Sequence, residues 1–190
     1  MLSDSSSQYP KDSLIHHLMK PGSFDHLVTE IELIETHISW IILTGQYAYK
    51  IKKPVDLGFL DFSSLEKRHY YCLQEVNLNQ RLAPLIYLKV VPIVGTVTCP
   101  KVIDDEKEIE PVKEQVKEQV IEYAVKMLQF PQSSQLDRML EKETLTTRHI
   151  DKFAELIADF HQSAVVASGE VEYGNPEMLM KPVEENFDWF

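Results

Sequence analysis

Apolar and polar residues alternate between residues 24 and 53, in runs that are rich in Ile, Val, Thr, Tyr and Trp. Successive side chains of a strand point to opposite faces, so this alternation is typical of strands. Gly45-Gln46 supplies a turn between the second and third runs. We predict strands at 28–35, 38–44 and 47–53.

The segment after these runs changes to a helical period. Ser63 and Glu66 have the spacing of a capping box at a helix start, and Pro84 marks the helix end. Apolar residues recur between these points at roughly helical spacing: Leu65, Tyr70, Leu73, Val76 and Leu82. One long helix is therefore predicted after the three strands.

Two more alternating runs follow this helix. The run "IYLKVVPIVGTV" predicts a fourth strand and "VIEYAVKMLQF" a fifth. The charged insert between them, 101–120, contains the repeat VKEQ in tandem. It fits either a solvated hairpin loop, which its charge favours, or a helical turn with three valines on one side: Val112, Val116 and Val120.

Helices are predicted at both ends of the chain. Residues 12–24 give a short helix that stops at Pro21 and Gly22. Beyond Pro131, "QSSQLDRMLEK" gives a short helix and "LTTRHIDKFAELIADFHQSAV" an amphipathic one, and from about residue 167 the chain is irregular. The stripe of the amphipathic helix comprises Ile150, Phe153, Ala154, Ile157, Phe160, His161 and Ala164. The predicted divisions are a tail with a short helix at 1–23, a main domain at 24–131 and a helical part at 132–190.

Composition narrows the range of partners. The 190 residues carry 19 basic and 30 acidic side chains, a net charge of −11, which repels nucleic acid and anionic membranes. Cys72 and Cys99 are too few for a disulfide framework or a zinc site, and "MLSDSSSQYP" lacks the pattern of a signal peptide. No apolar run is long enough to span a bilayer. We therefore expect a cytoplasmic protein in which any anion site is local.

The order of elements predicts an α+β fold that begins like the small lobe of a protein kinase. In that lobe a small residue and a lysine share one face of the third strand. The stretch "GQYAYKIKKP" places Ala48, Lys50 and Lys52 on one face. Ala48 could offer adenine a flat wall, and Lys50 could bind phosphates if Glu75 on the next helix held its side chain extended.

A simpler interpretation of the lysines remains beside this one. Lysines at a strand end are typical of a solvated edge that discourages aggregation. The strand order, together with Ala48 and Glu75, favours a nucleotide site at Lys50. Lys52 is the second candidate on the same face, and Lys53 is expected to be solvated.

The run "IETHISWIILTGQYAYKIKKPVDLGFLDFSSLEKRHYYCLQEVNLNQRLAP", with "EYAVKMLQFP" downstream, resembles a known family. It is similar to the N-terminal kinase-like module of bacterial proteins described as aminoglycoside phosphotransferase-like, in which a P-loop ATPase module often follows. The resemblance covers roughly 24–165 and is most specific at Glu35–Lys53 and Leu57–Phe62. It implies a five-stranded antiparallel sheet with one long helix, then the first helices of a large lobe, with ATP and Mg²⁺ bound between the lobes.

The resemblance also implies roles for single residues. Lys50 would contact the phosphates of the nucleotide and Glu75 would pair with it. The residues of the loop over the nucleotide would be Thr36, His37 and Ser39. The hinge whose backbone meets adenine would comprise Lys126, Met127 and Leu128. The loop "ETHIS" has no glycine, so its phosphate contacts would come from backbone amides and hydroxyls.

The chain departs from the family pattern where catalysis would occur. No HGD-type or DFG-type motif follows Phe160-His161, and the P-loop pattern G-x-x-x-x-G-K-[ST] is absent from the sequence. We assign no catalytic role to "RHID" at 148–151 or "LDFS" at 60–63, because both occur at the wrong place in the chain. We therefore expect a truncated, inactive piece of a phosphotransferase whose phosphate acceptor is unassigned.

Two functions remain open on these observations. The first is a kinase-family fragment that retains much of the nucleotide cleft. The second is a non-catalytic, kinase-like interaction or regulatory module whose acidic segment 104–122 binds a basic partner. The missing lobe, the P-loop ATPase module or a second copy of the chain would be the partners of the first.

Overall fold

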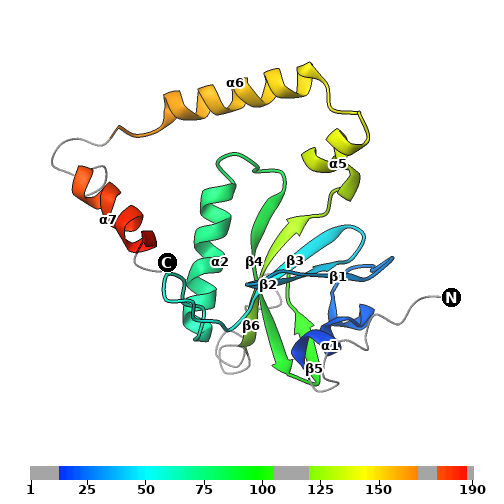
Figure 1. Ribbon diagram of the computed structural model, residues 1–190. Helices are drawn as coiled ribbons and strands as arrows, with labels where there is room; N and C mark the ends of the chain where they lie inside the picture. The colour runs from blue at the N-terminus through cyan, green and yellow to red at the C-terminus, as the bar shows by residue number, and fades with distance from the viewer. Residues whose placement is uncertain (1–12, 105–119, 167–174, 188–190) are drawn as a thin grey trace. The chain divides into compact units, whose positions relative to one another are not determined.

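The computed structural model describes residues 13–104, 120–166 and 175–187 (Figure 1). The chain divides into two units, Met1–Met139 and Leu140–Phe190. The first unit contains an antiparallel sheet and the helices that pack on it, and the described residues of the second unit include helices but no strand. The fold is therefore α+β, as the order of elements predicts.

Six antiparallel strands form the sheet, in the order β1-β2-β3-β6-β4-β5. Their bounds are β1 (Glu32–Glu35), β2 (Ser39–Leu43), β3 (Tyr47–Lys52), β4 (Tyr87–Thr96), β5 (Cys99–Val102) and β6 (Val120–Leu128). The five predicted strands are all present, but the prediction of five in total is wrong. Strand β5 pairs with the end of β4 and includes the first two residues of the predicted insert. Pro100 of β5 has no backbone N–H to donate to a neighbouring strand, and β5 can include it because β5 lies at the sheet edge.

Each face of the sheet has its own apolar cluster. On one face, α1 (Leu14–Leu18) and the short 3₁₀ turn η2 (Pro21–Ser23) pack with Phe24 against the strands. Tyr49 and Ile51 of β3 belong to this cluster and are fully buried. On the other face, α2 (Leu65–Asn79) buries Cys72 and Val76 against the middle of β6. Since side chains alternate along β3, Lys50 lies on the side of α2.

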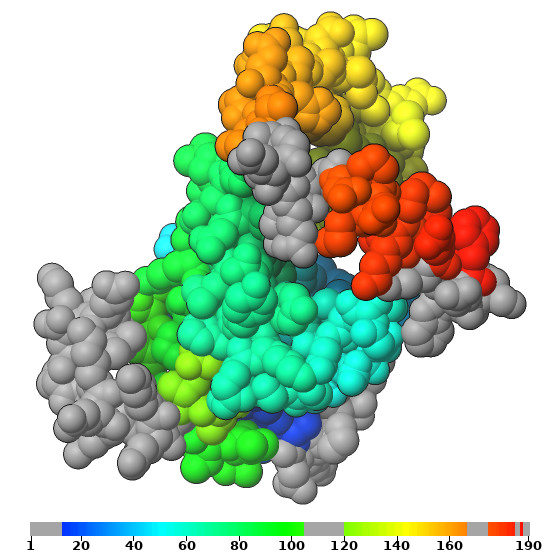
Figure 2. Space-filling view, turned by 90° about the vertical axis from the view of Figure 1, so that its left-hand side faces the viewer, coloured from blue at the N-terminus to red at the C-terminus, as the bar shows by residue number. Residues whose placement is uncertain are grey.

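The long helix α2 forms where it is predicted, but its cap and its buried face differ. The Ser64 hydroxyl, not that of Ser63, accepts the capping hydrogen bond, from the Lys67 amide. The buried residues are Arg68, Cys72 and Val76, whereas Tyr70 and Leu73 of the predicted stripe are exposed. The outer side of α2 lies at the surface, in the centre of Figure 2. Of the predicted stripe Val76 is buried, but apolar periodicity misplaced the rest of the face because the face also includes Arg68 and Cys72.

The remaining helices follow β6. Their bounds are η3 (Gln132–Ser134), α5 (Leu136–Glu141), α6 (Thr147–Ser163) and α7 (Pro176–Phe187). The expectation that the chain is irregular beyond residue 167 is wrong for α7, which starts with Pro176 after the capping side chain of Asn175. None of the helices in the described ranges is both long and apolar enough to span a membrane. Most of the charged insert, 105–119, lies outside the described residues, so its two alternatives stay predictions.

Candidate functional site

Glu75 connects α2 to β3 by binding two lysines at once. The Lys50 Nζ donates a hydrogen bond of 2.7 Å to Glu75 Oε1, and the Lys52 Nζ donates one of 2.6 Å to Oε2. The Glu75 side chain is 12% exposed, that of Lys50 26% and that of Lys52 6%. The predicted contact between Lys50 and Glu75 is therefore confirmed. Lys52, the second candidate on the same face, is the most buried of the three.

The charges of this Lys50–Lys52–Glu75 cluster do not cancel. Burial alone raises the pKa of Glu75, but the hydrogen bonds and charges of Lys50 and Lys52 outweigh burial and lower it overall. Burial raises the pKa of the neighbouring Cys72 thiol to about 12, so this thiol stays neutral. Two ammonium groups share one carboxylate, and the cluster keeps one net positive charge in a strongly acidic protein.

Strand pairing brings several of the predicted site residues to the side of α2. Ala48 pairs with Met127 of β6, and Lys52 pairs with Ser39 of β2. Directly paired residues point to the same face of a sheet, so all four side chains accompany Lys50. Ser39 is fully buried, and its hydroxyl has no hydrogen-bond partner among the described residues.

The loop between β1 and β2 is a tight turn closed by Thr36. The Thr36 hydroxyl accepts a hydrogen bond from the Ser39 amide and donates one to the Ser39 carbonyl, both of 3.0 Å. His37 at the tip is exposed. Ser39, which the alternating pattern places in the strand at 38–44 and the resemblance places in the loop, is the first residue of β2. The Thr36 hydroxyl is thus already used within the turn.

The predicted hinge lies inside the sheet. Lys126 and Met127 pair with both β3 and β4, so their backbone groups belong to the strand ladders. The Lys126 ammonium binds Asp104 and lies 3.7 Å from the centre of the Tyr47 ring. The chain leaves the sheet only after Leu128, the last residue of β6.

Lys53 is not a solvated lysine, which corrects the prediction. Its ammonium pairs with Glu35 of β1 and lies 5.3 Å from the centre of the Trp40 ring. These contacts are on the opposite side of β3 from Lys50, as the alternation predicts. Lys53 therefore helps to close the β1–β2–β3 meander.

A second buried ion pair was missed by sequence reasoning. The Arg68 Nε donates hydrogen bonds of 3.0 and 2.8 Å to the two carboxylate oxygens of Glu122. Arg68 also donates to the carbonyl oxygens of Phe62 and Ser63, just before α2. The only sequence signal was the acidic Glu122 inside an otherwise mostly apolar run, the predicted fifth strand, which is β6 in the structure. This pair fixes the first turns of α2 to β6.

The motifs RHID at 148–151 and LDFS at 60–63, to which we assign no catalytic role, each contain a side chain that makes local hydrogen bonds. His149 accepts a hydrogen bond of 3.1 Å from the Thr146 amide at the start of α6. Hydrogen bonds from Lys67 and Ser63 lower the pKa of Asp61 to about 2. Both side chains thus make local contacts at helix starts.

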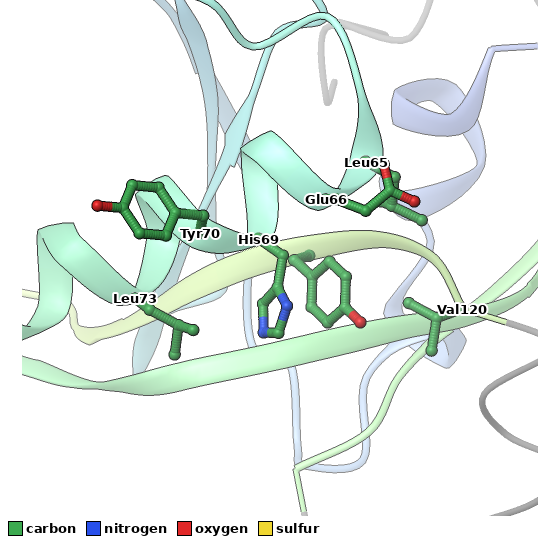
Figure 3. Close-up of a pocket in the computed structure, with 7 residues that line it drawn as sticks. Leu65, Glu66, His69, Tyr70, Leu73 and Val120 are labelled. Atoms are coloured by element: carbon green, nitrogen blue, oxygen red, sulfur yellow. The ribbon is translucent and has the colours of Figure 1, made fainter.

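A hollow lies between α2 and the start of β6 (Figure 3). His69 points from α2 towards the strands, and its ring stacks on that of Tyr123 with centroids 3.9 Å apart. Burial lowers the pKa of His69. The lining residues are Leu65, Glu66, His69, Tyr70, Leu73, Val120 and Tyr123. None of them belongs to the predicted nucleotide site.

Comparison with known proteins gives relatives but no function. Uncharacterized proteins of Mycobacterium bovis and of two strains of Mycobacterium tuberculosis are each 31% identical to the chain over 142 residues. The match covers 73% of this chain and 24% of each relative, so the chain spans about a quarter of the length of the curated relatives it matches. No protein-family model and no solved structure matches the chain.

Proposed function

We propose that this chain is the nucleotide-binding small lobe of a phosphotransferase with a protein-kinase-like fold, of the aminoglycoside phosphotransferase-like type. The observation that carries the proposal is the 2.7 Å ion pair between Lys50 of the third strand and Glu75 of the following helix. Kinases need this pair of residue types, at these places in the fold, to hold the nucleotide phosphates. The resemblance of the sequence run around Lys50 to that family points in the same direction.

The residues around Lys50 fit a nucleotide in size and charge. Lys50 is the partly exposed lysine of the cluster, so its ammonium, which donates a hydrogen bond to Glu75, can also donate to a phosphate from solvent. Ala48 and Met127 lie side by side on the same face and would form an apolar wall for adenine. Because Lys126 and Met127 have their backbone groups in ladders, we place the adenine-binding backbone just after Leu128.

ATP would supply the phosphoryl group, and Lys50 would neutralise charge on its phosphates. Magnesium is assigned to no residue, because the described residues contain no group of three or more His, Cys, Asp or Glu side chains suited to a metal. The sequence also lacks the family's catalytic motifs. The proposed activity of this chain is therefore nucleotide binding, without turnover of a phosphate acceptor.

Calorimetric titration of the full chain with MgATP tests the proposal. Lys50→Met should weaken binding by about 1 to 3 kcal/mol, or about 5- to 150-fold, because it removes a charge-assisted contact. Lys53→Met is the matched control: it removes a lysine of the same strand whose contacts are on the other side, and binding should stay within about twofold. A wild-type chain that binds no MgATP would contradict the proposal and favour the non-catalytic module.

A further inference from the structure

The two lysines that bind Glu75 differ in what else they can reach. The Lys52 side chain is 6% exposed and its ammonium lies 4.9 Å from the centre of the Phe62 ring, just ahead of α2. The Lys50 side chain is four times more exposed, at 26%. Only Lys50 is therefore placed to bind a ligand from solvent, and Lys52 is enclosed by protein.

Sharing one carboxylate solves a problem that a single pair would create. When a lysine turns towards a phosphate, the carboxylate that held it loses part of its counter-charge, which is costly for a buried group. Glu75 accepts its second hydrogen bond from Lys52, and this bond does not involve Lys50. The negative charge of Glu75 thus stays compensated.

We propose that Lys52 is a positioning residue that holds Glu75 and α2 against β3, so that Lys50 is free to bind phosphate. The hold of Lys52 on α2 does not depend on a ligand, whereas its benefit for phosphate binding rests on the proposed function. The Arg68–Glu122 pair acts near the start of α2, since it ties the first turns of this helix to β6. Two ionic contacts from different strands thus assemble α2 on the sheet before any nucleotide binds.

Two measurements on the full chain separate the lysines. Hydrogen exchange of the α2 amides reports how firmly the helix is held, and titration with MgATP reports the ligand site. Lys52→Met should speed α2 exchange by about tenfold or more, the size expected for loss of a charge-assisted hydrogen bond in a buried place. Lys50→Met should leave α2 exchange within about threefold of wild type, because Lys52 still holds Glu75.

The MgATP titration should give the reverse ranking. Lys50→Met should lose more affinity than Lys52→Met, whose loss comes only from a less ordered Lys50. Lys52→Arg should restore both α2 protection and affinity, because a guanidinium can also pair with Glu75 and lie over Phe62. Lys53→Met should change neither measurement.

Several results would overturn the proposal. Equal α2 exchange in Lys50→Met and Lys52→Met would show that Lys52 has no special hold on the helix. A loss of MgATP affinity in Lys52→Met as large as in Lys50→Met, with α2 still protected, would make Lys52 a ligand contact. If Lys52→Arg did not restore the protection of the α2 amides from exchange, the positive charge at position 52 would not be what holds the helix.

Two further situations leave the proposal testable. If wild type binds no MgATP, the proposed function fails, and the exchange of α2 alone decides the role of Lys52. If Lys52→Met does not fold, Glu75→Gln replaces it, since this change keeps the side-chain size and removes the charge that Lys52 binds. Exchange of α2 should then rise above that of Lys50→Met, and unchanged exchange would overturn the proposal.

Discussion

Glu75 gives the contact between α2 and β3 its dependence on pH. The lysines bind its ionised form, and they lower its pKa even though burial opposes this. Cys72 and Tyr87, which also face Glu75, have raised pKa values and stay neutral in acid. A carboxyl with a lowered pKa in the folded state adds stability above its unfolded pKa and loses it as pH falls through the folded value.

The free energy of unfolding should therefore fall as pH drops below the ordinary glutamate pKa of 4.5. Glu75→Gln should be less stable than wild type at pH 7, and the difference should shrink as both proteins are acidified. Urea unfolding at pH 7, 5, 4 and 3 measures this difference, and the comparison removes the effect of other carboxyls, such as Asp104. A difference that stays constant down to about pH 3 would show that Glu75 is not ionised and paired in the folded protein.

At the scale of elements, alternation was a sufficient guide to five of the six strands in the sheet and to the faces of β3. Tyr49 and Ile51 belong to one apolar cluster, and Lys50 points to the other face of the sheet, towards Glu75, because a strand has a period of two. The same pattern could not show β5, which is four residues long, contains Pro100 and merges into a charged run. Its strand structure depends on pairing with β4, and pairing is not visible in a local pattern.

Polar burial explains the other errors at this scale. The buried face of α2 begins with Arg68, which is acceptable inside only because Glu122 of β6 is opposite. These two residues are 54 positions apart in the chain, so neither could identify the other from the sequence. The burial of Lys52 and Lys53 was missed for the same reason, since it depends on Glu75 and Glu35. By contrast, the Lys50–Glu75 contact was expected from the resemblance to a kinase-like module, in which a lysine of the third strand pairs with an acidic residue of the next helix.

The hairpin between β2 and β3 depends on Gly45. Its φ of +90° is unfavourable for residues with a side chain, and an added Cβ would lie 2.1 Å from the Thr29 hydroxyl oxygen. The Gln129 side chain accepts hydrogen bonds from the Thr44 and Gly45 amides, so the turn has little freedom to relax. This turn sets the register that places Ala48 and Lys50.

Gly45→Ala should lower the free energy of unfolding by about 1 to 3 kcal/mol, from backbone strain and the close contact with Thr29. Gly22→Ala is the matched control, because an added Cβ there meets no atom within 4 Å and φ is not positive. Urea unfolding of both variants measures the effect. Equal stability of the two variants would show that the β2–β3 turn does not need glycine.

At the scale of the whole chain, the two units differ in how well they cover apolar side chains. The sheet of the first unit has packed helices on both faces, with Leu18, Ile42 and Tyr49 fully buried. The second unit contains no fully buried residue among those described, and its helix α6 exposes part of the predicted stripe, whereas Ile157 and Phe160 are half-buried. Ile150 is 50% exposed and Phe153 54%. Exposed apolar surface of this kind marks a place where another surface binds.

We therefore expect the isolated chain to self-associate through α6. Sedimentation velocity over a range of concentrations should show a mass that rises above that of the monomer, and Phe153→Glu should return it to the monomer, because a charge in the stripe is costly to bury. Glu155→Gln, an exposed change on the opposite side of the same helix, should leave association unchanged. A wild-type chain that stays monomeric at high concentration, with the amides of α6 well protected from exchange, would contradict this. That result would mean that the chain itself covers the stripe in solution.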